Sequence, residues 1–221
     1  SDLKFDKLIG SILHPVDEAA LDRSRAPNES PDDVLLGSLS AEVLSRHAGL
    51  FDIVVGNPPW NGFKDARKGA LNYTLRQLLA NLGSPATPPA AAMVARYGSP
   101  DIAFVLAASS WAKPGGAIGF AVHGRILFQA ESFGLRRHLF ERLRVTGVMN
   151  FAALRQDKKI WPKNDAQFAL MVAVNETPHP LDSFYFISPR HEPALSDEGA
   201  FRIDPGAALP LALHEVCSHP Q

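Results

Sequence analysis

The stretch FDIVVGNPPW, Phe51 to Trp60, is an apolar run that ends abruptly at a glycine and continues into Asn-Pro-Pro-Trp. Its first five residues are strand formers, interrupted only by Asp52. A run of this kind, bounded by glycine and proline, predicts a β-strand buried on both faces. Because ligands of open α/β sheets bind where the strands end, we expect the chemistry of the protein at Asn57 and the residues after it.

Two consecutive prolines make the turn after this strand rigid. Pro58 and Pro59 each fix φ near about −65° and lack a backbone N–H, so the carbonyls of Asn57 and Pro58 face no competing local donor. Asn57 adds a side-chain carbonyl oxygen, and Trp60 adds a flat aromatic face. These groups suit a planar ligand with an amino group, such as adenine, whose nitrogen they would aim at an electrophile. The alternative is a purely structural turn.

This motif resembles the catalytic motif of the gamma group of adenine-N6 DNA methyltransferases, in which Asn-Pro-Pro-aromatic follows a hydrophobic strand. The resemblance implies that Asn57, Pro58, Pro59 and Trp60 form the catalytic turn. Asn57 and Pro58 would accept hydrogen bonds from the target amine, while Trp60 stacks on a flipped-out base. It also implies S-adenosylmethionine as methyl donor, double-stranded DNA as partner, and a cytoplasmic enzyme of a type II or type IIG-like restriction-modification or phage-defence system.

The resemblance extends over residues 34–176. DIAFVLAASSWAKPGGAIGFAV from Asp101 is similar to the helix, Pro-Gly-Gly turn and strand after the family's catalytic loop, and ILFQAESFGLRRHLFERLRVTGVMNF to its next helix and strand. IWPKNDAQFALMVAV resembles the segment whose aromatic residue faces the catalytic aromatic across the flipped base. This assigns Trp161 as the second stacking face, with a core tryptophan as the alternative. Phe168 fits the core of the following strand better.

Two departures from the family concern the cofactor. No Gly-x-Gly loop occurs before Asn57, and Leu-Gly-Ser-Leu around Ser38 stands where an acidic residue is expected. The expected cofactor contacts are therefore Ser38, Asn57 and Asp101, although Asp101 also suits a helix cap. We expect a catalytic part of a larger methylase that is inactive alone, pairing with the remainder of its own polypeptide or with another copy through an exposed apolar edge.

Alternating strands and helices predict an α/β fold, a class I methyltransferase (Rossmann-like) sheet that is partial and ends in an antiparallel strand, with helices on both faces. Residues 1–33 form an uncertain segment, residues 34–176 the partial catalytic domain without its glycine-rich loop, and residues 177–221 the start of a C-terminal extension or target-recognition region. The expected strands are 34–37, 51–55, 117–122, 145–151 and 167–175, with a further one at 184–187. The expected helices are 40–47, 70–82, 90–97, 101–112 and 129–143.

Composition narrows the remaining possibilities. The 221 residues carry a net charge of −1, so DNA binding must be local rather than a property of the whole surface. The candidate phosphate contacts are Arg125, Lys158, Lys159 and Lys163, with solvated surface charges as the alternative. No apolar run approaches the roughly 18 residues of a membrane span, and we expect no membrane partner. The single cysteine and scattered histidines predict no internal disulfide and no metal site.

Three functions fit these features. The first is the catalytic part of a site-specific adenine-N6 DNA methyltransferase, which the position of Trp161 before the last strand favours. The second is a methyltransferase that acts on RNA or on a protein glutamine, since such enzymes also carry Asn-Pro-Pro-aromatic. The third is a noncatalytic scaffold or binding fragment that retains the fold.

Overall fold

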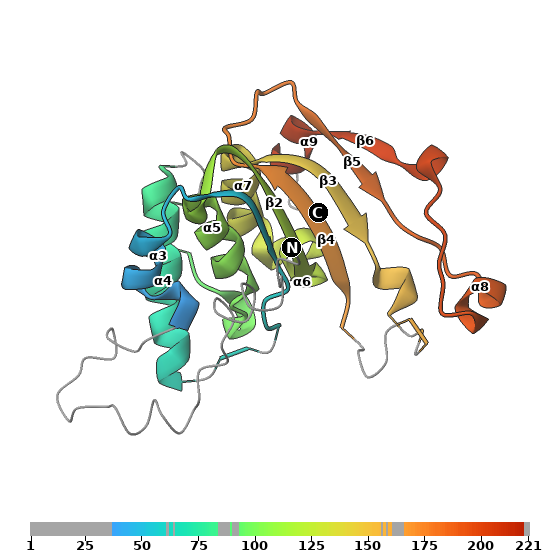
Figure 1. Ribbon diagram of the computed structural model, residues 1–221, viewed down its shortest axis with the longest axis horizontal. Helices are drawn as coiled ribbons and strands as arrows, with labels where there is room; N and C mark the ends of the chain where they lie inside the picture. Colours follow the sequence, from blue (N-terminus) through green and yellow to red (C-terminus); the bar gives the residue numbers. More distant parts are fainter. Residues whose placement is uncertain are drawn as a thin grey trace, which may run out of the picture.

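The computed structural model describes residues 37–60, 62–63, 65–83, 89, 93–155, 157, 159–160 and 166–218. These residues build one six-stranded sheet with helices packed on it (Figure 1). The strands are β1 (Phe51–Gly56), β2 (Ala112–His123), β3 (Arg144–Asn150), β4 (Phe168–Val174), β5 (Ser183–Ile187) and β6 (Leu209–Ala212). The helices are α3 (Ala41–Arg46), α4 (Asp65–Leu82), α5 (Asp101–Trp111), α6 (Gly124–Phe128), α7 (Phe133–Arg142), α8 (Pro193–Asp197) and α9 (Leu213–Ser218). Short 3₁₀ turns are η2 (Gly37–Leu39), η4 (Arg96–Gly98), η5 (Ala130–Ser132), η6 (Ala152–Leu154) and η7 (Pro205–Ala207).

The strand order is β1-β2-β4-β3-β5-β6. β1 is parallel to β2 and β3 to β5, whereas β4 is antiparallel to both β2 and β3, and β6 is antiparallel to β5. The expected α/β sheet and the antiparallel direction of the strand near 167–175 are therefore confirmed. Its place differs, because β4 lies inside the sheet and two further strands follow it.

Most of the expected elements lie within a few residues of their observed bounds. Ser40 caps α3 by accepting a hydrogen bond from the Val43 N–H, and α5 begins at Asp101 as expected. The expected helix at 90–97 is wrong for its described residues, which reach only the short turn η4. Tyr97 has a φ of 57° and Gly98 a φ of 66°, and two successive left-handed residues end any right-handed helix.

Two other helix and strand predictions need correction. The helix expected at 129–143 begins only at Phe133, because α6 and η5 come first. Of the strand expected at 34–37, residues 34–36 lie outside the described residues, and Gly37 begins η2.

The main core lies between the sheet and its helices. α5 is apolar nearly all round because it is enclosed by neighbours, and nine of its residues are buried. Leu71 and Leu75 of α4 reach it from one side, and Ile118 of β2 and Met171 of β4 from the other; all four are at most 1% exposed. This packing fixes the strands whose ends carry the candidate site.

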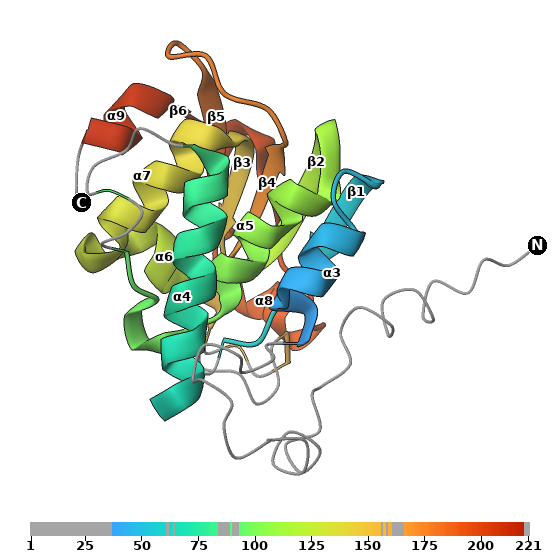
Figure 2. The ribbon, with the colours of Figure 1, turned by 90° about the vertical axis from the view of Figure 1, so that its left-hand side faces the viewer.

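One face of the sheet has no helix layer in the described part of the chain. Figure 2 shows α3 to α7 in front of the strands, on the same side. The expectation of helices on both faces, and of a strand at 51–55 buried on both faces, is therefore wrong for these residues: β1 is an edge strand, with Ile53 67% and Val55 59% exposed. Val55 begins a row of paired residues that crosses the open face of the sheet. The row continues through Gly119, Val172, Gly147 and Tyr185. The exposed apolar side chains thus lie on the open face of the sheet. Pairing through the edge of the sheet stays a prediction.

Candidate active site

The Asn-Pro-Pro-Trp turn lies at the carboxyl end of β1. The strands β1, β2, β3 and β5 run in the same direction, and β4 runs in the opposite direction. The carboxyl ends of β2 and β3 and the beginning of β4 therefore lie at the same end of the sheet as the turn. Pro58 is buried, whereas Asn57 and Pro59 are exposed. The buried proline anchors the turn and leaves Asn57 exposed to solvent.

Trp60 is held in place by the neighbouring strands. Its indole Nε1 donates a hydrogen bond to the carbonyl of Ala121 in β2, at 3.3 Å. Its ring stacks on Phe168, with centroids 5.5 Å apart and planes at 18°, and meets His123 edge-on at 6.3 Å. Trp60 is therefore partly buried and oriented before any ligand arrives.

A second, smaller core lies beneath this turn. Phe151, Leu154 and Phe168 are buried in it, and Trp60, Met149, Ile160 and Phe201 pack against them. Phe168 is stacked on Phe151 at 4.9 Å with planes at 6°, and Phe151 meets Phe201 edge-on at 5.4 Å. This second core joins the Asn-Pro-Pro-Trp turn to the β3–β4 connection and to the C-terminal region. The prediction that Phe168 is a core residue is confirmed.

Two glycines allow the loop after the turn to touch the η4 loop. The Phe63 N–H donates to the Gly98 carbonyl at 2.9 Å. A Cβ at Gly98 would lie 2.3 Å from the carbonyl oxygen of Phe63, and one at Gly62 would lie 1.9 Å from that of Tyr97. Only glycine fits such a close approach of two backbones.

Asp101 is fully buried at the start of α5. One carboxylate oxygen accepts hydrogen bonds from Ser99 Oγ at 2.8 Å and from the Ile102 N–H at 3.1 Å, and the other from the His123 N–H at 2.9 Å. The Ser99 hydroxyl oxygen also lies 3.4 Å from the carbonyl oxygen of Trp60. Burial raises the pKa of Asp101, although the hydrogen bonds oppose this. The carboxylate thus connects α5 to β2, and through Ser99 to the turn.

His123 ends β2 beside Trp60 and is 8% exposed. Its Nδ1 accepts a hydrogen bond from the Arg125 N–H at 3.1 Å. Burial, with a smaller contribution from the Arg125 charge, lowers the pKa of His123 to about 4. The imidazole is consequently neutral near pH 7. The sequence reasoning missed His123, yet a polar residue at the end of a strand next to β1 was a usable signal.

The candidate DNA contacts differ in their surroundings. The Arg125 guanidinium lies over the Tyr97 ring, 4.8 Å from its centroid, close to the loops around the turn. The Lys159 ammonium is paired with Asp197, so part of its charge is already compensated. Trp161, Lys158 and Lys163 lie outside the described residues. Arg125 is linked to the turn because its N–H donates to His123, whose ring meets Trp60 edge-on.

The three residues expected to contact a cofactor differ in their exposure and partners. Asp101 has both oxygens occupied by internal donors, and Ser38 is half-buried in η2. Asn57 alone is an exposed polar group at the strand end. Among the described residues no group of three or more histidine, cysteine or acidic side chains could hold a metal ion. No helix within the same ranges is both long and apolar enough to cross a bilayer.

The fold is a mixed α/β sheet in which the antiparallel strand β4 lies between β2 and β3. No protein-family model and no curated protein matches the chain. A modification subunit assigned to a type I restriction enzyme from Vibrio vulnificus YJ016 shares the fold, with a TM-score of 0.50 and 14% identity over 73% of this chain and 33% of that one. The type I restriction-modification methyltransferase subunit from Streptococcus thermophilus matches with a TM-score of 0.49 and 16% identity, over 77% and 32%. The type IIG restriction endonuclease BpuSI matches with a TM-score of 0.49 and 14% identity, over 78% and 20%. The chain thus spans between a fifth and a third of these proteins.

Proposed function

We propose that this chain is the catalytic part of a site-specific DNA methyltransferase that transfers a methyl group from S-adenosylmethionine to the N6 of a flipped-out adenine. The observation that carries the proposal is the exposed Asn57 on a turn fixed by the buried Pro58 and followed by the braced Trp60. The fold shared with the Vibrio vulnificus modification subunit supports it.

The turn would act by positioning rather than by strong base catalysis. In the proposed complex, the side-chain oxygen of Asn57 and the carbonyl oxygen of Pro58 accept the two hydrogens of the target amine. Their attraction grows as positive charge develops on the nitrogen, so it stabilises the transition state more than the bound substrate. Trp60 stacks on the base, and its contacts with Ala121 and Phe168 remove the cost of ordering its ring. The neutral His123 beside it adds no charge that would repel the nascent cation.

We further propose a division of labour along the polypeptide. Residues 34–176 present the target amine, and residues 177–221 begin an extension toward target recognition. S-adenosylmethionine supplies the electrophilic methyl group when bound. Arg125, beside Tyr97, contacts DNA phosphate, and the protein works on double-stranded DNA as part of a restriction-modification or phage-defence system.

The test is methyl transfer by the full-length protein to DNA, RNA and glutamine-containing peptides. Asn57→Ala should lower the methylation rate on adenine-containing DNA by roughly a hundredfold or more, since removing one group aimed at transition-state charge has an effect of that order. Asn81→Ala is the matched control, because Asn81 is exposed near the end of α4, away from the turn. Near wild-type turnover by Asn57→Ala would remove Asn57 from the mechanism. Methylation of RNA or peptide but not of DNA would refute DNA as the substrate and identify RNA or protein as the substrate class.

A further inference from the structure

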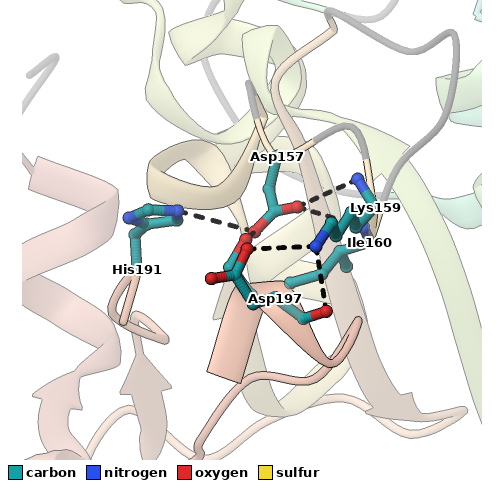
Figure 3. Close-up of polar contacts among 6 residues, drawn as sticks. Asp157, Lys159, Ile160, His191 and Asp197 are labelled. Carbon is teal, nitrogen blue, oxygen red and sulfur yellow. Dashed lines mark hydrogen bonds and ion pairs between the residues drawn. The ribbon is translucent and has the colours of Figure 1, made fainter. Parts of the chain in front are cut away.

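Asp157 joins two segments of the chain that are far apart in sequence. It lies in the β3–β4 connection, and its side chain is only 2% exposed. One carboxylate oxygen accepts hydrogen bonds from the backbone N–H groups of Lys159 and Ile160, both at 3.1 Å. The other accepts a hydrogen bond from the Ser196 hydroxyl of α8 and lies 3.5 Å from Nε2 of His191 (Figure 3).

A second contact fastens the same two segments. Lys159 Nζ donates to the backbone carbonyl of Asp197 at 2.9 Å and to its carboxylate at 3.0 Å, as Figure 3 also shows. Lys159 and Asp197 are both well exposed, so this pair contributes little alone. Asp157 differs because a buried carboxylate is costly unless its partners are in place. The Ser196 hydrogen bond, more than any other contact, lowers the pKa of Asp157.

Asp157 is connected to the candidate base-binding turn through Ile160 and Phe168. Ile160, whose N–H the carboxylate holds, packs against the second core of Phe151, Leu154 and Phe168. Phe168 is in turn the platform on which Trp60 stacks. From the C-terminal side, Phe201 packs edge-on against Phe151. The segment 191–201 therefore touches the support of Trp60 from two directions.

We propose that Asp157 is a positioning residue for base binding: it clamps the β3–β4 connection to α8 and so fixes the platform beneath Trp60. This inference rests on the proposed function and deepens it. It makes the C-terminal segment 191–201 a working part of the base-binding site, through which events in the C-terminal region reach the catalytic turn.

Two substitutions separate the clamp from the local turn. Asp157→Asn keeps an oxygen that can accept from the Lys159 and Ile160 N–H groups. It removes the charge that accepts from the Ser196 hydroxyl and leaves an amide nitrogen that can only donate a weaker hydrogen bond to the Ser196 oxygen. Ser196→Ala removes the other half of the clamp and leaves the aspartate turn intact. Ser218→Ala is the matched control, because the Ser218 hydroxyl donates to the Glu215 carbonyl of its own helix, away from Asp157 in the sequence.

The experiment uses the full-length protein and duplex DNA with 2-aminopurine at the target position. Fluorescence reports the flipped base, and a plain duplex reports overall affinity. Asp157→Asn and Ser196→Ala should each weaken binding of the flipped base by roughly tenfold, as expected for loss of a hydrogen bond to a charged group. Plain-duplex affinity should stay close to wild type, while the melting temperature falls by several degrees because the same bond holds two segments of the folded chain together. The double variant should be no worse than either single one, since both break the same contact. Ser218→Ala should match the wild type.

Three results would overturn the inference. Unchanged flipped-base fluorescence in both variants would mean that the clamp does not reach Trp60. If plain-duplex affinity falls by the same factor as flipped-base affinity, together with the melting temperature, Asp157 is a purely structural residue. Absence of any fluorescence rise with the wild-type protein would instead refute the proposed function, and the inference with it.

Discussion

Replacing Phe168 with leucine tests whether the second core supports the Asn-Pro-Pro-Trp turn. Phe168 is 3% exposed and lies between two rings, stacked on Trp60 at 5.5 Å and on Phe151 at 4.9 Å. A stacked aromatic pair contributes about 0.5–1.5 kcal/mol beyond the burial of its area. Leucine keeps most of the apolar volume but loses both stacks, so we expect a loss of about 1–3 kcal/mol in the free energy of unfolding. For a chain of this size, this corresponds to a fall of roughly 2–12 °C in melting temperature.

The same substitution should weaken base binding, because Trp60 loses the ring that orients it. If the lost stacking also holds Trp60 ready, binding of an extrahelical 2-aminopurine should weaken about five- to hundredfold. Phe140→Leu is the control: Phe140 is 1% exposed and meets Phe184 edge-on at 5.3 Å in the main core. It should lower the melting temperature but leave base binding unchanged. Equal base binding by the two variants would refute the supporting role of Phe168.

Three other predictions follow from single contacts. NMR titration of His123 should give a pKa of about 4, below the 6.5 of an ordinary histidine; stability measured by urea unfolding should then be fully present above pH 6.5 and decline as the pH falls toward 4, a slope that His123→Gln should reduce. Gly98→Ala should cost more than the roughly 1–2 kcal/mol of a left-handed alanine, because its Cβ would lie 2.3 Å from the Phe63 carbonyl oxygen. Gly49→Ala, with a φ of 63° and open space, should show only that backbone cost in the same unfolding assay. Val55→Lys, on the open sheet face, should reduce self-association of the isolated chain in sedimentation experiments without lowering its stability; unchanged association would exclude this face as the contact.

The local elements that carry the site could be predicted from the sequence. The apolar run before Asn57 and the two prolines define where β1 ends, and the acid at Asp101 with an apolar run defines α5. These signals are short-range, since strand and helix patterns, proline and caps act within a few residues. The position of the turn at a strand end followed from the same signals.

Long-range contacts were beyond the sequence. Asp101 meets the His123 N–H, and Asp157 meets Ser196, and no periodicity relates residues so far apart. The apolar pattern of β1 was read as burial on both faces, whereas Ile53 is 67% exposed. An apolar pattern indicates that both faces of a strand can be buried, but it does not identify the segment that would bury them.

The position of β4 couples formation of the sheet to the order of synthesis. β2 and β3 do not pair with each other, so the hydrogen bonds that join the β1–β2 pair to the β3–β5–β6 group all pass through β4. A nascent chain that has not yet released Val174 from the ribosome holds only β1–β2 and the unpaired β3, with the facing edges of β2 and β3 open. Pairing of strands that are far apart in sequence is slow, because the entropy of loop closure is lost before the new contacts offset it. Pairing of β4 with β2 and β3 therefore joins the two groups of strands into one sheet. It also brings Phe168 into its stacked contact with Trp60.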